Sequence, residues 1–485
     1  MTTRESFRSP VSLREVLILV GAVGAAWQAC DEWIAGVAVF VLWLVWRVPT
    51  VPDGPPVLSM ALTFQWVQSS IGIFYHGLTG RMLQAMVVDE YRQMTLIALG
   101  CVTALTFGLR LGLRALPDRF RDSPVAALTL KSILIAYVLS ILFGGAINEY
   151  AWEVPELTQA ILAANFVHLA LVFLILRRLS FPTFNWPVML GLLSLEIVLG
   201  MTGFFAGFRE PIIMMMIVII ERFNPRRVQQ WVVLAGLFVF MAGLGAIWMN
   251  VRIGYRADLM SGVIGESRED RVNRLGQLSR DWINSDHSDI MGQFDVVVDR
   301  MWPVYYPALA LRRVPKLVPH TDGAIITGAL VHVLSPRVFF PTKAIIGSDS
   351  AMVRKYSGVF VAGEEQDTSI AFGYAAESYL DFGVPLMFVP VLLYGAFLGL
   401  AFSFFTRMLT VSELRIGLIT LIFWLSLYLF ERSWVKTLGL ACTLMLYLGA
   451  PAIMLDRYIS RRLIGGTTSP VWDVDEDDAA AVHES

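Results

Sequence analysis

Two charged residues, Arg209 and Glu210, stand in a short break between two apolar segments. The break is spaced by glycines and ends at Pro211. A charge close to the end of a membrane helix is costly unless it is paired or functional. Pro211 suits the first turn of a helix, whose free amides would then face outward beside Arg209. We expect this combination to bind an anion such as a diphosphate. The alternative is an Arg–Glu pair that only seals the turn.

Two further arginines, Arg252 and Arg256, follow directly after the apolar segment 231–250. The loop charges described below place them on the outer side of the membrane, where positive residues are unusual. They are candidates to hold an anionic ligand through charge-assisted hydrogen bonds. The alternative is that both side chains extend to lipid headgroups.

Glu377 and Asp381 are candidates for proton transfer. They are four residues apart, so they share one face of a helix that leads into an apolar segment. Burial at an apolar boundary raises the proton affinity of a carboxylate, which suits a general base. Tyr374 and Tyr379 flank the pair and could contact a sugar. The alternative is a polar helix start without chemistry.

Three histidines, His287, His320 and His332, lie in the long polar segment 251–382. Only His287 is clustered with other polar side chains, serines and aspartates. No HxxxH or HExxH spacing occurs, so the sequence predicts no metal site. A single histidine could act as a base, and His287 is our candidate.

The composition is that of a polytopic membrane protein. Apolar residues make up 56% of the chain and charged residues 16%, whereas soluble domains carry about 25% charge. A net charge of -2 gives no reason to expect a nucleic-acid partner. No phosphate-binding glycine loop is present, so a nucleotide-driven reaction is not expected. Polar residues within the apolar segments include His76, His168 and Glu196. We expect His76 and His168 to be hydrogen-bonded inside the core. Glu196 is a candidate buried acid, and the alternative is a hydrogen bond between two helices.

About twelve apolar segments along the chain are candidates to span a membrane, which takes about 20 residues of helix. They are residues 16–30, 33–46, 57–78, 94–113, 125–147, 158–176, 187–205, 208–220, 231–250, 384–405, 416–429 and 435–455. Some are short enough to be tilted, broken or interfacial. The predicted fold is therefore all-α.

Arginines gather in alternate short loops, which predicts the orientation of the chain. One set of loops holds Arg47, Arg110, Arg114, Arg119, Arg121, Arg177, Arg178, Arg222, Arg226, Arg227 and Arg407. Both termini should be cytoplasmic and the long loop extracytoplasmic. The chain then divides into an N-terminal helix block (1–250), the outer loop (251–382), C-terminal helices (383–456) and an acidic tail expected to be disordered (457–485).

The outer loop itself should be helical. Residues 267–283 carry apolar side chains at helical spacing among mixed charges, and residues 295–311 should form a helix bent at Pro303 and Pro307. A third helix, 323–334, could be capped by the preceding Thr-Asp pair. We expect a helical layer that lies on the membrane.

Several of these features together resemble the bacterial oligosaccharide repeat-unit polymerases, the Wzy-type, O-antigen polymerase-like family. The features are the outward Gly207-Phe208-Arg209 break, the long late outer loop, Pro336-Arg337 followed by Phe340-Pro341-x-Lys343, and Glu377-x-Tyr379-Leu380-Asp381-Phe382-Gly383. The likeness covers roughly the second half of the chain, and the last motif is its most specific part. Here Glu210-Pro211 follows the arginine where the family has a small residue.

The resemblance implies a GT-C-like membrane glycosyltransferase in the bacterial inner membrane. Such an enzyme joins polyprenyl-diphosphate-linked oligosaccharides outside the cytoplasm, without metal or cofactor. Chain-length regulators and flippases would be its protein partners. By position the resemblance makes Arg209 the diphosphate arginine and places Glu377 in the terminal motif, with Arg252, Arg337 and Lys343 as further diphosphate ligands. The residue patterns described above add Arg256 to the diphosphate ligands, Asp381 and His287 to the candidates for proton transfer, and Tyr374 and Tyr379 as sugar contacts.

Three other functions remain as alternatives. An O-antigen ligase relative would share the scaffold and donor but use another acceptor. A metal-dependent polyprenyl-phosphate-sugar transferase would need acidic residues on a roomy first outer loop, whereas Asp31 and Glu32 lie in a short turn. A transporter would need polar residues at mid-membrane. The third apolar segment offers some, namely Gln65, Gln68, Ser69, Ser70 and His76.

Overall fold

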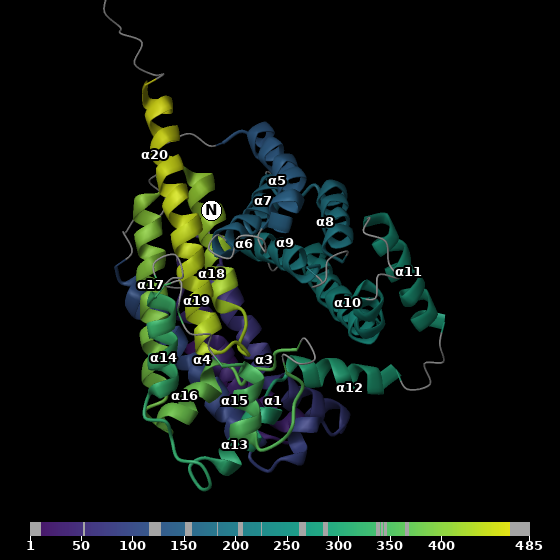
Figure 1. Ribbon diagram of the computed structural model, residues 1–485, viewed down its shortest axis with the longest axis vertical. Coiled ribbons are helices and arrows are strands. Elements are labelled where there is room, and N and C mark those ends of the chain that lie inside the picture. The colour runs from purple at the N-terminus through teal and green to yellow at the C-terminus, as the bar shows by residue number, and fades with distance from the viewer. Residues whose placement is uncertain are drawn as a thin grey trace, which may run out of the picture.

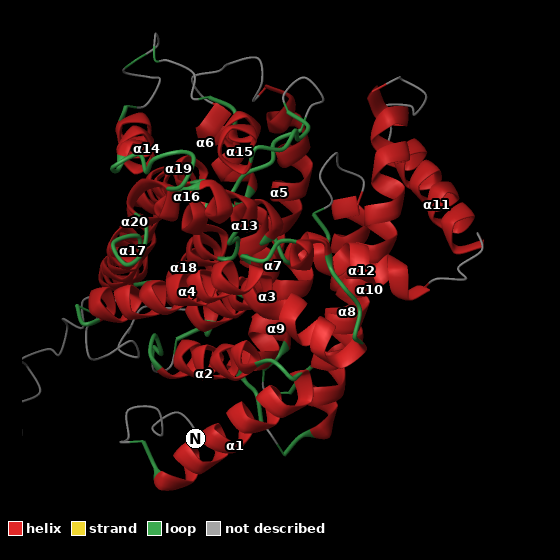
Figure 2. Cartoon of the chain, turned by 90° about the horizontal axis from the view of Figure 1, so that it is seen from below, coloured by secondary structure: helices red, strands yellow, loops and turns green. Residues whose placement is uncertain are grey.

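The computed structural model describes residues 11–51, 54–115, 128–150, 158–181, 183–201, 207–224, 226–260, 268–284, 290–335, 340, 343, 347–363 and 368–465. These residues form helices and connecting loops and contain no strand (Figure 2). The prediction of an all-α chain is therefore confirmed.

Figure 1 shows the helices of the described chain, coloured in chain order. Those of the first half are α1 (Leu13–Cys30), α2 (Trp33–Arg47), α3 (Val57–Thr79), α4 (Tyr91–Leu113), α5 (Leu130–Tyr150), α6 (Thr158–Asn165), α7 (Val167–Leu179), α8 (Trp186–Met201), α9 (Arg209–Glu221) and α10 (Val228–Met260). Those of the second half are α11 (Arg268–Asn284), α12 (Ile290–Met301), α13 (Tyr305–Arg313), α14 (Ala324–Leu334), α15 (Asp349–Ser357), α16 (Tyr374–Phe382), α17 (Phe388–Met408), α18 (Ser412–Leu427), α19 (Trp434–Leu444) and α20 (Ala450–Gly465).

Seven helices of the described chain are long and apolar enough to cross a membrane. They are Leu13–Cys30, Val57–Thr79, Tyr91–Leu113, Thr158–Leu179, Val228–Arg252, Phe388–Met408 and Trp434–Arg461. Each coincides with one of the predicted segments. The other five predicted spans overlap α2, α5, α8, α9 and α18, so among the described residues seven of about twelve predicted spans are long and apolar enough to cross a membrane.

The described part of segment 251–382 is largely helical, as predicted, and α11 confirms the amphipathic helix at 267–283. The bent helix predicted for 295–311 is two helices, α12 and α13, which are separated around Pro303. Pro307 lies in the first turn of α13, where a missing N–H breaks no helical hydrogen bond. In Figure 1, α13, α15 and α16 lie together at one end of the long helices, whereas α11 and α12 lie beside α10.

Two contacts hold this scaffold together. Gly108 and Gly112 of α4 face Gly395 and Gly399 of α17 so closely that a Cβ atom added at Gly399 would lie 2.4 Å from the Leu109 carbonyl oxygen. Small residues at this spacing let two helix backbones approach in a membrane. The other contact ties the outer segment to α3.

That second contact is made by Trp302, which follows α12 and is buried. Its ring lies against the Cα of Gly72, and its Nε1 donates to the Ser69 carbonyl oxygen at 3.1 Å. Nearby, the Tyr75 hydroxyl donates to Asp295 at 2.7 Å. The indole thus joins the end of α12 to α3.

Candidate functional site

The candidate site is organised around the loop 428–433, which joins α18 to α19. Two glutamines of α3 hold this loop. The Gln65 side-chain amide donates to the Leu427 carbonyl oxygen, and Gln68 donates to that of Tyr428 at 2.8 Å. Gln68 Oε1 also accepts from Phe430 N at 3.2 Å. These bonds satisfy backbone groups at the end of α18, which stops at Leu427.

The polar side chains of α3 are therefore accounted for by contacts inside the chain. Beside the glutamines, the Ser69 and Ser70 hydroxyls donate to carbonyl oxygens one turn earlier, and His76 Nδ1 lies 2.9 Å from the Arg81 carbonyl oxygen. From the sequence, these residues could be the mid-membrane polar groups of a transporter. Their hydrogen bonds within the chain explain them without a transported substrate.

Two arginines converge on Tyr428 at the start of this loop. Arg209, the first residue of α9, donates to the Tyr428 hydroxyl at 3.1 Å, and its guanidinium carbon lies 4.9 Å from the ring centroid. Arg432 donates to the same hydroxyl at 3.3 Å and lies 5.0 Å from the same centroid. A second Arg432 bond, to the Leu425 carbonyl oxygen at 2.7 Å, fixes its orientation.

Acidic residues neutralise part of this charge. Arg209 pairs with Glu210 at 2.8 Å, and Glu431 pairs with Arg300 of α12 at 3.0 Å. The three arginines, Arg209, Arg300 and Arg432, and the two glutamates, Glu210 and Glu431, together carry a net charge of one positive unit. Glu210 Oε2 is buried and has no hydrogen-bond partner among the described residues. Only one oxygen of this carboxylate is therefore satisfied.

The start of α9 lies beside these arginines. Its N-cap residue, Phe208, makes no side-chain capping bond to the helix. The positive end of the helix dipole lies at the same place as Arg209. The Arg209 side chain is half-buried, with 34% of its surface exposed. Arginines and a helix start together form a site suited to an anion.

Glu377 lies at the other end of the same loop. Its Oε2 accepts a hydrogen bond from Trp434 N, the first residue of α19, at 2.7 Å. The next residue, Ser378, accepts from the Trp434 indole N–H at 2.9 Å. Burial, with Glu377 only 2% exposed, raises the pKa of this carboxyl to about 8. Arg209 and Glu377 thus contact opposite ends of one short loop.

Asp381 holds the start of α14. It accepts from the Thr321 hydroxyl, from Ile325 N at 3.0 Å and from Ile326 N at 2.9 Å. Both carboxylate oxygens are therefore engaged by the first turn of another helix. The N-cap position of α14 is Gly323, with a positive φ of 87°, so the cap predicted from Thr321 is provided by Asp381 instead.

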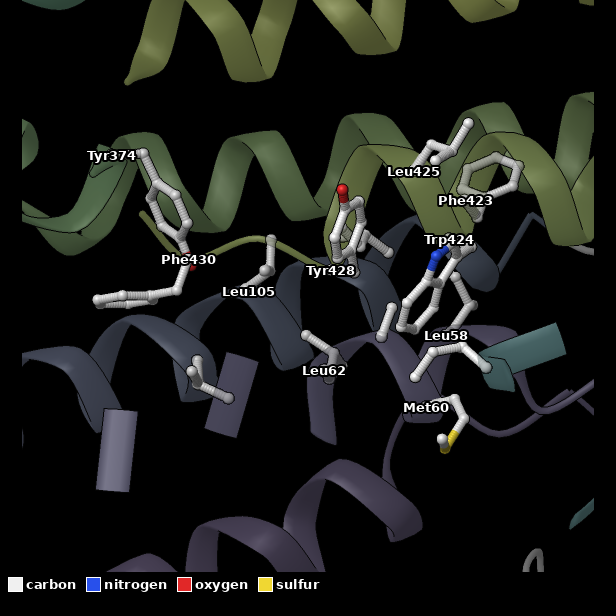
Figure 3. Packing of buried hydrophobic residues seen from close by; sticks show 14 of the residues in the cluster. Leu58, Met60, Leu62, Leu105, Tyr374, Phe423, Trp424, Leu425, Tyr428 and Phe430 are labelled. Carbon is white, nitrogen blue, oxygen red and sulfur yellow. The ribbon is translucent and has the colours of Figure 1, made fainter. Parts of the chain in front are cut away.

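The two predicted sugar-binding tyrosines are packed inside the fold. The Tyr374 hydroxyl donates to Gln65 Oε1 at 2.6 Å, and its ring lies beside Phe430 (Figure 3). The Tyr379 hydroxyl donates to the Val314 carbonyl oxygen at 3.0 Å. Tyr374 is 1% exposed and Tyr379 is 8% exposed, so both hydroxyls and most of both rings are used by the protein itself.

The remaining predicted residues do not gather at the loop 428–433 by any contact that we describe. The Lys343 ammonium donates to the His332 carbonyl oxygen near the end of α14. Arg252 is a half-buried residue of α10. Arg256 lies on the same helix, with its side chain outside the described part of the structure. Arg337 and His287 lie outside the described residues altogether.

Sequence reasoning missed Arg432 and Tyr428. A signal for Arg432 was present, because it stands in a short polar break, 431–433, between two apolar segments. The same cost of a charge at a membrane helix end that selected Arg209 applies to it. Tyr428 carried no such signal, since an aromatic residue at a helix end is also explained by interfacial anchoring.

Comparison with known proteins places the chain in one family. No curated protein and no solved structure gives a significant match. A family model matches residues 87–404, about two thirds of the chain. The matched region includes Arg209, Glu377 and Asp381 but ends before the loop 428–433. The protein therefore belongs to the family described as a domain of unknown function, DUF8712.

Proposed function

We propose that this protein is a membrane glycosyltransferase that takes a polyprenyl-diphosphate-linked oligosaccharide as donor. It would polymerise such repeat units on the extracytoplasmic side of the bacterial inner membrane, with both termini cytoplasmic. The observation that carries the proposal is the convergence of Arg209 and Arg432 on Tyr428 at the start of α9. The sequence resemblance supplies the substrate class.

The arginine pair has the chemistry that a departing diphosphate requires. Cleavage of the glycosidic bond leaves negative charge on the phosphate oxygens, and arginine donates paired hydrogen bonds to such groups. In the described structure the Arg209 guanidinium donates two hydrogen bonds, from Nε and one Nη, to the Glu210 carboxylate. The diphosphate would displace this carboxylate and take over its hydrogen bonds, while Tyr428 keeps the two guanidinium groups together.

The acceptor hydroxyl must lose a proton as the new bond forms, and we assign Glu377 as the general base that takes this proton. Asp381 is a poorer candidate, because three donors already engage its two oxygens. Glu377 uses Oε2 for Trp434 N, which leaves Oε1 for a substrate hydroxyl. Burial raises the pKa of Glu377 to about 8. The fraction of Glu377 that is ionised, and so able to act as a base, therefore increases as the pH rises toward 8.

The proposal is tested by mass spectrometry of lipid-linked glycans in the native host. The gene is deleted and replaced by wild type, Arg432→Gln, Arg209→Gln or the control Arg280→Gln, whose arginine lies on the exposed face of α11. Deletion and both site variants should remove long polymer and leave single repeat units on the lipid. The control should behave as wild type.

Two other outcomes would change the conclusion. Long polymer that persists on its lipid carrier after deletion, but no longer reaches its final acceptor, would identify a ligase that uses the same donor site. An unchanged glycan and lipid profile after deletion would refute both reactions. Full function of Arg432→Gln together with loss in the deletion strain would refute the role of the arginine pair.

A further inference from the structure

A second polar cluster lies among the apolar helices α5, α7 and α8. It consists of Tyr137, Ser140, His168 and Glu196. The Tyr137 hydroxyl donates to Glu196 Oε1, and His168 Nε2 lies 2.7 Å from Glu196 Oε2. Ser140 Oγ lies 3.2 Å from His168 Nδ1. The rings of Tyr137 and His168 stack with their centroids 5.3 Å apart.

The cluster lies near the middle of its helices. Ser140, His168 and Glu196 each stand about ten residues from the start of α5, of the apolar stretch Thr158–Leu179 and of α8. Ten residues of helix rise about 15 Å, half of a hydrocarbon layer about 30 Å thick. Glu196 is 3% exposed. An ionisable residue at this depth is expensive and is a functional candidate by default.

The hydrogen bonds define how many protons the cluster holds. The Ser140 hydroxyl donates to the Tyr137 carbonyl oxygen at 2.7 Å, so it offers a lone pair to His168. His168 Nδ1 therefore carries a hydrogen. One proton then lies between Nε2 and Glu196 Oε2. With that proton the pair is neutral overall, either as imidazolium and carboxylate or as imidazole and carboxylic acid.

Gain or loss of a proton must change this geometry. Removal of the shared proton leaves two acceptors 2.7 Å apart, and a second proton places two donors there. Either change repels α8 from α7. Histidine is the side chain that ordinarily changes charge between about pH 5 and 8. We propose that His168 and Glu196 form an intramembrane proton-binding site, which exchanges a proton with water and sets the packing of α8 against α7.

Other charged groups on the surrounding helices pair elsewhere. Arg177 of α7 pairs with Glu221 of α9 at 2.8 Å, and Arg178 pairs with Glu413 of α18. Arg209 and Glu210 pair at the start of α9, Lys131 lies in the first turn of α5, Arg415 lies on α18, and α6 has no titratable side chain. Among the described residues, Tyr137 is the titratable group from α5 that contacts the pair.

The test is spectroscopic and uses the full chain in lipid nanodiscs. Infrared difference spectra between about pH 5 and about pH 9 report protonated carboxylic acids, and nitrogen-15 resonances of labelled histidines report the protonation of each ring nitrogen. We expect a carboxylic-acid difference band and a His168 nitrogen shift with a common midpoint. Spectra are recorded in the Glu377→Gln background, because Glu377, with a pKa of about 8, would add a carboxylic-acid band of its own. Glu196→Gln should remove the component of the band that shares the His168 midpoint, and Tyr137→Phe should move that midpoint, because Tyr137 donates to Glu196. The control Glu15→Gln, on α1, should change neither signal.

The His168 resonance, assigned as the one that His168→Gln removes, decides the proposal. If the His168 nitrogens do not shift across this pH range and no carboxylic-acid component shares a midpoint with them, the cluster is a fixed hydrogen-bond network that only joins three helices. Persistence in Glu196→Gln of the component that shares the His168 midpoint also overturns the proposal. His168→Gln, which should abolish the nitrogen shift, identifies the histidine resonance if Glu196→Gln does not fold.

Discussion

Replacement of Asp381 by asparagine tests whether this residue serves the fold or the chemistry. The substitution keeps the size of the side chain but removes its charge and one acceptor oxygen. One charge-assisted hydrogen bond to α14 is lost, worth about 2 kcal/mol. The interaction of the charge with the helix start adds about 1 kcal/mol. We therefore expect the first turn of α14 to open about 3 kcal/mol more easily.

Amide hydrogen exchange followed by mass spectrometry measures this opening directly, because Ile325 N and Ile326 N are the amides that Asp381 binds. About 3 kcal/mol corresponds to exchange roughly 100-fold faster in the peptide that covers Ala324–Leu334. Glu377→Gln is the matched control, because its carboxyl contacts α19 rather than α14. If Asp381→Asn exchanges as slowly as wild type but no longer makes polymer, the structural role is refuted. Asp381 would then be assigned to the reaction instead.

Three further predictions follow from contacts described above. Burial raises the pKa of Glu377 from 4.5 to about 8, so the folded state binds more protons than the unfolded state between these values. Wild type should therefore lose thermal stability as the pH rises through this window, and Glu377→Gln should show a flatter profile. Gly399→Ala should destabilise the α4–α17 contact by about 1–3 kcal/mol and reduce the folded fraction in fluorescence-detected size exclusion. Gly191→Ala, where nothing lies within 4 Å of the added Cβ, should not. Trp302→Ala should cost about 3–5 kcal/mol, measured as a lower Tm.

Each of these expectations has a contrary result. Parallel pH profiles of wild type and Glu377→Gln would mean that this carboxyl is not protonated in the folded protein. Equal folded fractions of the two glycine variants would remove the close backbone approach as a source of stability. An unchanged Tm for Trp302→Ala would mean that the outer helices are held by other contacts.

Much of the scaffold follows from local patterns. The long apolar segments and the amphipathic α11 were predicted, because helical periodicity acts over one or two turns. At Pro303 a bend was predicted, whereas the chain ends one helix and begins another there. The number of membrane crossings was not predictable in this way. The α9 and α18 helices are apolar but short, and segment length alone does not say whether they cross.

The candidate site depended on contacts between distant parts of the chain. The placement of Glu377 and Asp381 on one helix face was correct, since it requires only a spacing of four. Their partners, Trp434 N and the start of α14, could not be deduced from that spacing. Arg209 and Arg432 meet at Tyr428, and the Tyr428 carbonyl oxygen is bound by Gln68, which stands 360 residues earlier in the chain.

The early end of α18 has a consequence for how a substrate would arrive. Its 16 residues rise about 24 Å, whereas the hydrocarbon layer is about 30 Å thick. A helix that starts at one face of the hydrocarbon layer would therefore end several ångströms short of the other face, and the loop after it would lie at the depth of the upper acyl chains. A molecule with a long isoprenoid tail would reach this depth from within the bilayer, whereas a water-soluble sugar phosphate would have to enter the hydrocarbon layer.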